Sequence, residues 1–369
     1  MITPAPIADE FEHLRKIEQK FELRLPSINS ARENSTRIRQ AITAVVDQAT
    51  PENCGVVVCG SLGRSEMTCQ SDVDWKLLVD GAVSAQHRDE VLRIDRTMGA
   101  LSREFKFNSP NATGAFAGMC FSHELVHAIG GEADSNSNTT LRILLLLEAR
   151  AISRPLVLDR VIRSILARYF EPDNFAYKQN TERDYFPRFL MNDVVRFWRT
   201  MAVDYAAKVV ERGRAGWALR NAKLRFSRKL LFASGMLLAH EVVLGMKQPV
   251  PNLSTDPAAV FELIDRIQQL TKLSPLEMLA AAALRRADGW PGARRAATDI
   301  FSSYDAFLGI LNDTDKRKEL GNLPLEQAAT NPTFNLVRNL GQQFEDGLNA
   351  YFLDGPTDVA LLSRKYAIF

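Results

Sequence analysis

Residues 59–75 read CGSLGRSEMTCQSDVDW, and this stretch decides the fold of the first part of the chain. The apolar, β-branched run that leads into it, CGVVVCG (54–60), predicts a short buried strand. The alternating run that leaves it, DVDWKLLVDG (72–81), predicts a second strand that stops at Asp80-Gly81. The stretch therefore predicts two neighbouring strands joined by a short segment that begins with a glycine turn.

Helices are expected on both sides of these strands. Residues 8–24 and 27–48 have apolar residues at helical spacing, and so do residues 84–105. The run GAFAGMCF (114–121) predicts a third strand, whose small residues favour close backbone packing. A helical lead-in therefore precedes a small sheet.

The rest of the chain is predicted to be helical. From Asn138 onward, the segments with regular apolar spacing all have helical length. The expected fold class is α+β, with a small mixed β-sheet core and a large all-helical C-terminal domain. The expected domains are N-terminal helices at 1–52, the sheet-bearing core at 53–160 and the helical domain at 161–369.

Two carboxylates stand at the start of the second predicted strand. Side chains alternate along a strand, so Asp72 and Asp74 share one face while Val73 and Trp75 point to the other. Two carboxylates this close repel each other unless a cation lies between them. Carboxylate oxygens favour Mg²⁺, which is commonly held by one or two carboxylates together with substrate phosphates. The pair therefore predicts an Mg²⁺ (or Mn²⁺) site.

The turn before the carboxylates is suited to a phosphate. Gly60 allows close approach of the backbone, and Ser61 opens a predicted short helix over 62–67 with free N–H groups. The expected nucleotide-binding residues therefore include Gly60 and Ser61. Arg64 has two readings, a phosphate contact or a structural ion pair with Glu66.

This arrangement resembles the signature of the polymerase-β-type nucleotidyltransferase superfamily, in which Gly-Gly or Gly-Ser precedes Asp-x-Asp by about ten residues. Gly63-Arg64-x-Glu66 and the run 71–74 are most similar to the nucleotidyltransferase domain of bacterial PII-uridylyltransferases. The run LLEAR (146–150) is similar to a segment further along that domain.

The resemblance covers roughly residues 55–155 and makes 53–160 the expected catalytic core. It implies transfer of a nucleoside monophosphate from an NTP, with Asp72 and Asp74 as metal ligands and Ser61 near the phosphates. PII-uridylyltransferases also carry a phosphohydrolase domain that needs a His-Asp pair, and none of the five histidines here precedes an aspartate. The acceptor therefore stays open.

A third catalytic carboxylate is expected after the third strand. Glu124 is favoured because it lies nearest the end of that strand, although it also suits the first turn of a helix capped by Ser122. Glu104 and Asp134 are the alternatives. The run 134–140 is either a capped helix entry or a contact to ribose and base.

His123 and His127 would share a helix face, and packing is favoured over metal binding because no third ligand stands at a suitable spacing.

The segment 183–229 is strongly basic. It holds twelve Lys or Arg against four acids, a net +8, so the remainder of this +2 chain carries −6. One interpretation is ion pairing with acids elsewhere. The other is that the segment faces the aspartates and binds NTP phosphates or a polyanionic acceptor, with Lys223 and Arg228 as the expected contacts.

The composition narrows the classes of protein to which the chain can belong. The chain has 369 residues, 46% hydrophobic and 24% charged, which is typical of globular proteins. A net charge of +2 argues against a general nucleic-acid coat. No apolar run of membrane-spanning length and no signal-like N-terminus is present, and the four cysteines form no CxxC pair. A cytoplasmic bacterial protein with reduced thiols is expected.

We therefore expect a metal-dependent nucleotidyltransferase that transfers NMP to a hydroxyl of a protein, an RNA or a nucleotide and releases pyrophosphate. A homo-oligomer is compatible with the sequence, and no membrane partner is expected. The alternative is a non-catalytic, antitoxin-like module that binds a nucleotide or partner and retains the fold.

Overall fold

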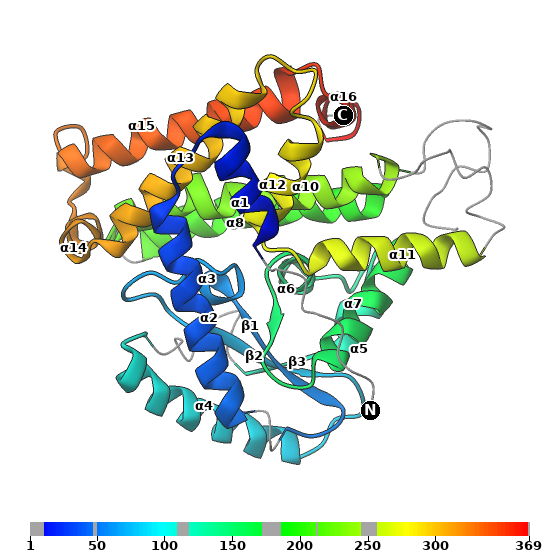
Figure 1. The fold of residues 1–369 in the computed structure, drawn as a ribbon. Helices are drawn as coiled ribbons and strands as arrows, with labels where there is room; N and C mark the ends of the chain where they lie inside the picture. Colours follow the sequence, from blue (N-terminus) through cyan, green and yellow to red (C-terminus); the bar gives the residue numbers. More distant parts are fainter. Residues whose placement is uncertain are drawn as a thin grey trace.

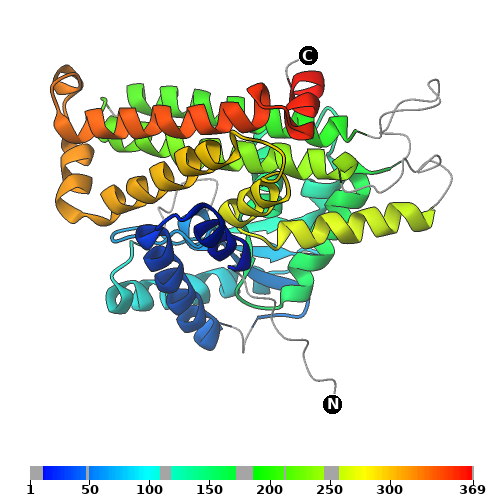
Figure 2. The same ribbon diagram turned by 45° about the horizontal axis from the view of Figure 1, so that its top comes forward.

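The computed structural model of the protein describes residues 11–46, 50–108, 118–171, 186–211, 213–244 and 257–367. A small sheet with its own flanking helices lies against a large body of helices from the second half of the chain (Figures 1 and 2). The fold class is α+β, as expected from the sequence.

The sheet has four strands in the order β3-β2-β1-β4. Their bounds are Cys54–Cys59 (β1), Asp74–Val79 (β2), Met119–Phe121 (β3) and Arg150–Ala151 (β4). The central strand β1 pairs antiparallel with both β2 and β4, whereas β2 and β3 are parallel. The sheet is therefore mixed, as predicted.

The two strands predicted around the opening stretch are confirmed as β1 and β2. The third is confirmed at its end, because β3 covers 119–121 while residues 114–117 lie outside the described residues. The prediction of no strand after Asn138 is wrong for β4. A two-residue strand carries too little alternation to be recognised, and it forms here only because β1 offers it a partner.

One face of the sheet is covered by α2 (Pro26–Val46) and α4 (Gln86–Phe105), drawn in blue and cyan in Figure 1. Val56 and Val58 of β1 point into this layer, where they join Ile42 in one apolar cluster. β-branched residues pack well on a pleated surface, and this explains why this short run forms the central strand.

The opposite face packs against α5 (Ser122–His127), α6 (Asn136–Leu147) and α7 (Pro155–Tyr169). Val57 and Leu78 point to this side, in agreement with strand alternation. Their apolar cluster continues without interruption into the helices of the second half, so this face of the sheet and the helical body share one core.

The helical body starts at α8 and is joined by α1, which packs on α12, and by α2, which packs on α13. Its members are α1 (Glu12–Phe21), α8 (Arg188–Glu211), α9 (Trp217–Lys223), α10 (Lys229–Leu244), α11 (Pro257–Thr271), α12 (Pro275–Arg285), α13 (Ala293–Asn312), α14 (Thr314–Asn322), α15 (Pro332–Asn349) and α16 (Asp358–Tyr366). Three short helices, η3 (Leu224–Arg228), η4 (Leu325–Gln327) and η5 (Ala350–Asp354), complete it. The predicted boundaries at 52 and 160 stay predictions.

Several of these helices begin at a side chain that caps their free N–H groups. Ser274 accepts from the Glu277 amide, Asn331 from Phe334 and Thr357 from Ala360. Such caps define helix starts in the sequence as well as in the structure. Among the described residues, no helix combines the length and apolar character that a membrane crossing requires.

Candidate functional site

The site begins with the carboxylates at the start of β2. Val73 and Trp75 are buried in the cluster under α2 and α4, so Asp72 and Asp74 face the other side, as alternation predicts. Asp72 is exposed and Asp74 is partly buried. The backbone at Asp72 is held by a parallel bridge to Asn108, which fixes the start of the strand.

The Gly60-Ser61 turn lies directly beside Asp74. The antiparallel register pairs Cys59 with Asp74, so the chain turns at the next residue, next to the carboxylate. Gly60 has φ +64°, and a Cβ added there would lie 2.5 Å from Asp74 Oδ2. Only glycine tolerates both the left-handed backbone and this contact. The short helix that follows is α3 (Gly60–Gly63), so the helix predicted at 62–67 begins earlier and ends earlier.

Glu148, at the end of α6, holds this turn in place. Its side chain is 0% exposed; Oε1 accepts from the Gly60 amide at 2.8 Å and Oε2 from Arg64 Nη1 at 2.6 Å. The Gly60 N–H is thus occupied, and the role expected for Gly60, close approach of the backbone to a phosphate, stays a prediction. The sequence signal for Glu148 is its place in LLEAR, which the prediction of a third carboxylate did not use.

Arg64 has the structural role rather than a phosphate contact. Its guanidinium is buried, with Nε donating to Glu66 Oε2 at 2.8 Å and Nη1 to Glu148. Both faces of the fork are therefore used inside the protein. Among the described residues, the Ser61 hydroxyl donates to the sulfur of Met67 at 3.3 Å, a weak acceptor that a stronger one can replace.

Two basic side chains of the helical body act electrostatically on Asp74, and their predicted contact with NTP phosphates stays a prediction. Lys223 ends α9 and Arg228 ends η3, a π-helical segment. Lys223 and Arg228 are five positions apart in the chain. In an α-helix this spacing separates two side chains by about 140° around the axis, whereas the wider turn of a π-helix, with its i→i+5 hydrogen bonds, brings them towards one face. Within the described part of the chain neither residue makes a hydrogen bond or ion pair through its side chain, and both are partly buried.

The carboxylates of β2 and the basic side chains of the helical body shift each other's pKa values. Burial raises the pKa of Asp74 to about 6, with further contributions from Glu148 and Asp72, while Arg228 and Lys223 oppose the rise. Burial lowers the pKa of Lys223 to about 8, helped by Arg317 and opposed by Asp72. Asp74 and Lys223 are largely shielded from water, so their charges are costly and a ligand that neutralises both is favoured.

Arg317, on α14, is a third cation that sequence reasoning missed. Its pKa is lowered mainly by burial, and Asp72 acts on it favourably. Nη2 donates to the Gln70 carbonyl at 2.7 Å and Nη1 to Thr68 Oγ1 at 3.3 Å. Arg317 therefore holds the loop that leads into Asp72. Nothing in its local sequence signals this role, because 247 residues separate it from Gln70.

The first interpretation of the basic segment 183–229, ion pairing with acids elsewhere, describes part of it, and the phosphate-binding interpretation stays a prediction. Besides the two site residues, four basic side chains pair with acids: Arg196 with Asp134, Lys208 with Asp204, Arg214 with Glu326 and Lys229 with Glu345. The segment thus includes ordinary ion pairs, while Lys223 at the end of α9 and Arg228 at the end of η3 act on Asp74.

Glu124 does not join the aspartates. β2 and β3 run parallel, with Val79 opposite Phe121. The helix α5 therefore begins at the edge where β2 ends, whereas Asp74 stands where β2 begins. Asp74 and Val79, at the two ends of β2, lie about 16 Å apart at ~3.3 Å per residue. Glu124 is exposed there, and Glu104 is exposed near the end of α4, on the other face of the sheet.

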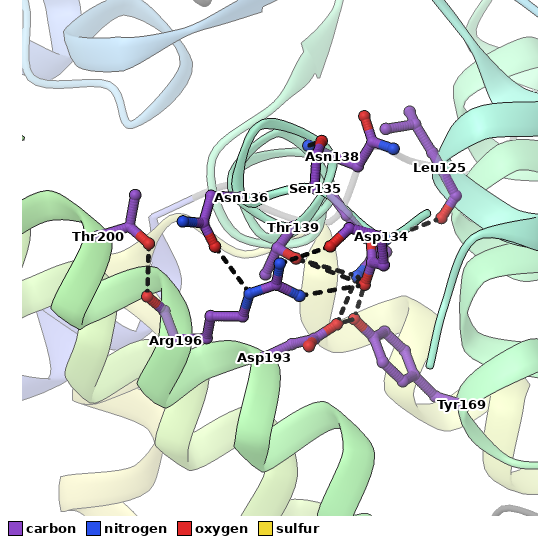
Figure 3. A network of polar contacts seen from close by, with 11 residues as sticks. Leu125, Asp134, Ser135, Asn136, Asn138, Thr139, Tyr169, Asp193, Arg196 and Thr200 are labelled. Carbon is purple, nitrogen blue, oxygen red and sulfur yellow. Dashed lines mark hydrogen bonds and ion pairs between the residues drawn. The ribbon is translucent and has the colours of Figure 1, made fainter. Parts of the chain in front are cut away.

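Asp134 belongs to a buried network between the two halves, shown in Figure 3. Arg142, 0% exposed, donates to Asp134 Oδ2 at 2.7 Å and to Asp193 Oδ2 at 2.6 Å. Tyr169 is hydrogen-bonded to the same Asp193 oxygen. Ser135 caps α6 by accepting from the Asn138 amide at 3.1 Å, so the run 134–140 is a capped helix entry.

The remaining polar residues form no obvious metal centre. The rings of His123 and His127 lie 4.6 Å apart on α5, and both are exposed. The four cysteines are free, and three of them are buried. In the described parts of the chain, no group of three or more His, Cys, Asp or Glu side chains is placed to hold a metal ion by itself.

A comparison with protein families matches residues 28–103 to a family described as "Putative nucleotidyltransferase DUF294". The match spans most of α2, β1, the Gly60 turn, Asp72, Asp74 and most of α4. No curated protein matches the chain. The part of the chain that carries the turn and the aspartate pair is therefore similar to a nucleotidyltransferase-type family.

Proposed function

We propose that the protein is an Mg²⁺- or Mn²⁺-dependent nucleotidyltransferase that moves an NMP from an NTP to an acceptor hydroxyl and releases pyrophosphate. The observation that carries the proposal is the placing of Asp72 and Asp74 beside the Gly60-Ser61 turn, opposite Lys223 and Arg228 of the helical body. The family match over 28–103 supports it independently.

The donor set fits a hard divalent cation. Asp72 and Asp74 present oxygen atoms on one face, and the raised pKa of Asp74 reflects negative charge that its neighbours only partly balance. Two carboxylates together with substrate phosphates match the usual coordination of Mg²⁺. When bound, such an ion would stabilise charge on the phosphates and favour deprotonation of the acceptor hydroxyl.

The protein's own residues would orient the triphosphate. Lys223 and Arg228 would supply donors for phosphate oxygens from the helical side, where partial burial strengthens charge interactions. Ser61 would donate its hydroxyl to a phosphate in place of the Met67 sulfur. Arg317 would keep the loop before Asp72 in position. Water exclusion and alignment between the two halves would then favour in-line displacement.

The proposal specifies the acceptor only as a hydroxyl group. The resemblance of the catalytic stretch to PII-uridylyltransferases supports a protein side chain, and the basic segment supports an RNA end or another nucleotide. We place the reaction in the bacterial cytoplasm, where NTPs are abundant and the free thiols stay reduced.

The test uses each α-labelled NTP with Mg²⁺ or Mn²⁺, with and without cell extract, followed by separation of protein, RNA and small molecules. Wild type should label one class, and Asp74→Asn should lose at least about 100-fold of the rate. Asp80→Asn is the matched control, because Asp80 follows the other end of the same strand and pairs with Arg160. It should keep the wild-type rate.

Two outcomes would overturn the proposal in different ways. Metal-dependent NTP binding by calorimetry without any labelling would favour the non-catalytic module. Neither binding nor labelling by wild type would remove nucleotides from the function altogether.

A further inference from the structure

A cavity of about 380 Å³ lies at the C-terminal end of α10, among helices that the nucleotide site does not use. Its charged lining residues are Glu241 on α10, Arg266 on α11, Arg285 and Arg286 at the end of α12, and Asp358 at the start of α16. Cavities that bind small molecules commonly have volumes in this range. The cavity is therefore a second place where a ligand can be held.

The charges that line the cavity do not balance. Arg285 forms an ion pair with Glu241, and Arg286 Nε donates to Asp358 Oδ1 at 2.5 Å. These two pairs use both carboxylates of the lining. One guanidinium, that of Arg266, therefore leaves the cavity with a net positive charge.

Arg266 uses only part of its guanidinium inside the protein. Nη2 donates to the backbone carbonyls of Glu241 at 2.9 Å and Val242 at 3.0 Å, close to the end of α10. Among the described residues Arg266 forms no ion pair with a carboxylate, and its Nε is buried without a hydrogen-bond partner. Burial lowers the pKa of Arg266, and Glu241 only partly offsets this cost. An anion in the cavity would balance the charge.

The rest of the lining is apolar. Leu244 of α10 and Leu270 of α11 face the cavity, and both pack on the apolar core. No aromatic side chain is among the described residues that line the cavity, so it offers a nucleobase no ring to stack on. A ligand that combines an anionic group with a short alkyl chain matches this lining.

The cavity is remote from the candidate nucleotide site. Arg228 immediately precedes the first residue of α10, whereas the cavity lies at the other end of this helix. The 16 residues of α10 span about 24 Å at 1.5 Å per residue. A ligand small enough for the cavity cannot reach Asp74 at the same time.

We propose that this cavity binds a small organic anion, a carboxylate or a phosphate that carries a short alkyl chain. The charged group pairs with Arg266, and the alkyl chain lies against Leu244 and Leu270. The site is separate from the proposed nucleotide site and does not depend on the proposed function.

The first experiment is calorimetry on the full chain without a divalent metal, using acetate, butyrate, inorganic phosphate and butyl phosphate as probes. Each alkyl-bearing probe should bind about fivefold or more tightly than its shorter counterpart, because the leucines shield its extra carbon atoms from water. The tighter of butyrate and butyl phosphate identifies the charged group. Failure of all four probes to bind would overturn the proposal.

Arg266→Met should weaken binding of the tighter probe by about tenfold or more, because a charge-assisted contact is lost. Arg163→Met is the matched control. Arg163 pairs with Asp265, the residue next to Arg266, but it lies outside the lining of the cavity. It should bind the probe as wild type does, and equal losses in the two variants would contradict the assignment.

A second variant keeps the contact between Arg266 and the end of α10. Leu270→Trp leaves every charge in place and fills part of the cavity. It should weaken butyrate or butyl phosphate by about fivefold or more, and wild-type affinity in this variant would overturn the proposal.

Lys223→Met separates the cavity from the nucleotide site. The variant should bind the probe with wild-type affinity, since Lys223 lies beyond the opposite end of α10. Loss of binding in Lys223→Met together with full binding in Arg266→Met would assign the anion to the aspartate side and refute the proposal. None of these measurements uses an NTP, so failure of the proposed function would leave their outcomes unchanged.

Discussion

Glu148 accepts a 2.8 Å hydrogen bond from the Gly60 amide, so the residue that ends α6 holds the turn that ends β1. The two residues are 88 positions apart in the chain. The same carboxylate also binds Arg64, so Glu148 links the turn and its following helix to the end of α6.

Glu148→Gln should lower the free energy of unfolding by about 3 kcal/mol, because a neutral amide leaves the buried Arg64 with Glu66 as its remaining partner. Urea denaturation at pH 7 measures this. Glu345→Gln removes a more exposed partner of Lys229 and should cost less than about 1 kcal/mol. Similar losses for both variants would show that the buried pair has no special weight.

A comparison of Gly60→Ala with Gly213→Ala should separate the effect of backbone strain from the effect of the contact with Asp74. Gly213 also has a positive φ, +53°, but no atom lies within 4 Å of an added Cβ, so Gly213→Ala carries only the strain. Both variants should lose about 1–2 kcal/mol of stability. Only Gly60→Ala should weaken Mg²⁺-dependent NTP binding, by about tenfold or more, since its Cβ displaces the carboxylate. Equal binding by the two variants in calorimetry would contradict this role of Gly60.

NTP affinity should fall as the pH rises through about 8, the pKa of Lys223 in the free protein. The lysine is charged below this value and neutral above it, so its attraction for phosphate is present at pH 7 and lost at higher pH. Calorimetric titrations between pH 6.5 and 9 measure the slope. Lys223→Met should bind more weakly at pH 7 and lack the step, whereas Lys208→Met, whose lysine pairs with Asp204, should keep it.

Acid should destabilise the protein through His240. Burial lowers the pKa of His240 from 6.5 to about 3, so the folded protein keeps the ring neutral while the unfolded chain takes up a proton. Stability is therefore full above pH 6.5 and decreases below it, by about 2 kcal/mol at pH 5. In urea denaturation, His240→Leu should lose less stability than wild type between pH 6.5 and pH 5. His123→Leu, at an exposed position, should show the wild-type loss, and an unchanged pH slope in His240→Leu would refute the assignment.

Several parts of the site are readable in the sequence because they depend on neighbours in the chain. Alternation in DVDW places Asp72 and Asp74 on one face and buries Val73 and Trp75. The β-branched run before Gly60 makes β1, and the glycine makes the turn. The uneven spread of charge also marked the segment that supplies Lys223 and Arg228.

Other parts could not be predicted, because they depend on which elements meet. Glu124 was chosen for being nearest a strand end, but the parallel pairing of β2 with β3 puts that end away from Asp74. Arg64 was open between two roles until Glu148 was placed beside it.

The sequence by itself determined the local pattern: an α+β chain, a Gly-Ser turn and a carboxylate pair on one strand face. Only the tertiary structure decided that Glu148 holds the turn, that Arg317 holds the loop before Asp72, and that the charges of Lys223 and Arg228 act on Asp74. The physical reason is that alternation and turn formation act over a few residues. The burial that raises the pKa of Asp74 and lowers that of Lys223 arises only when distant helices close around the end of the strand.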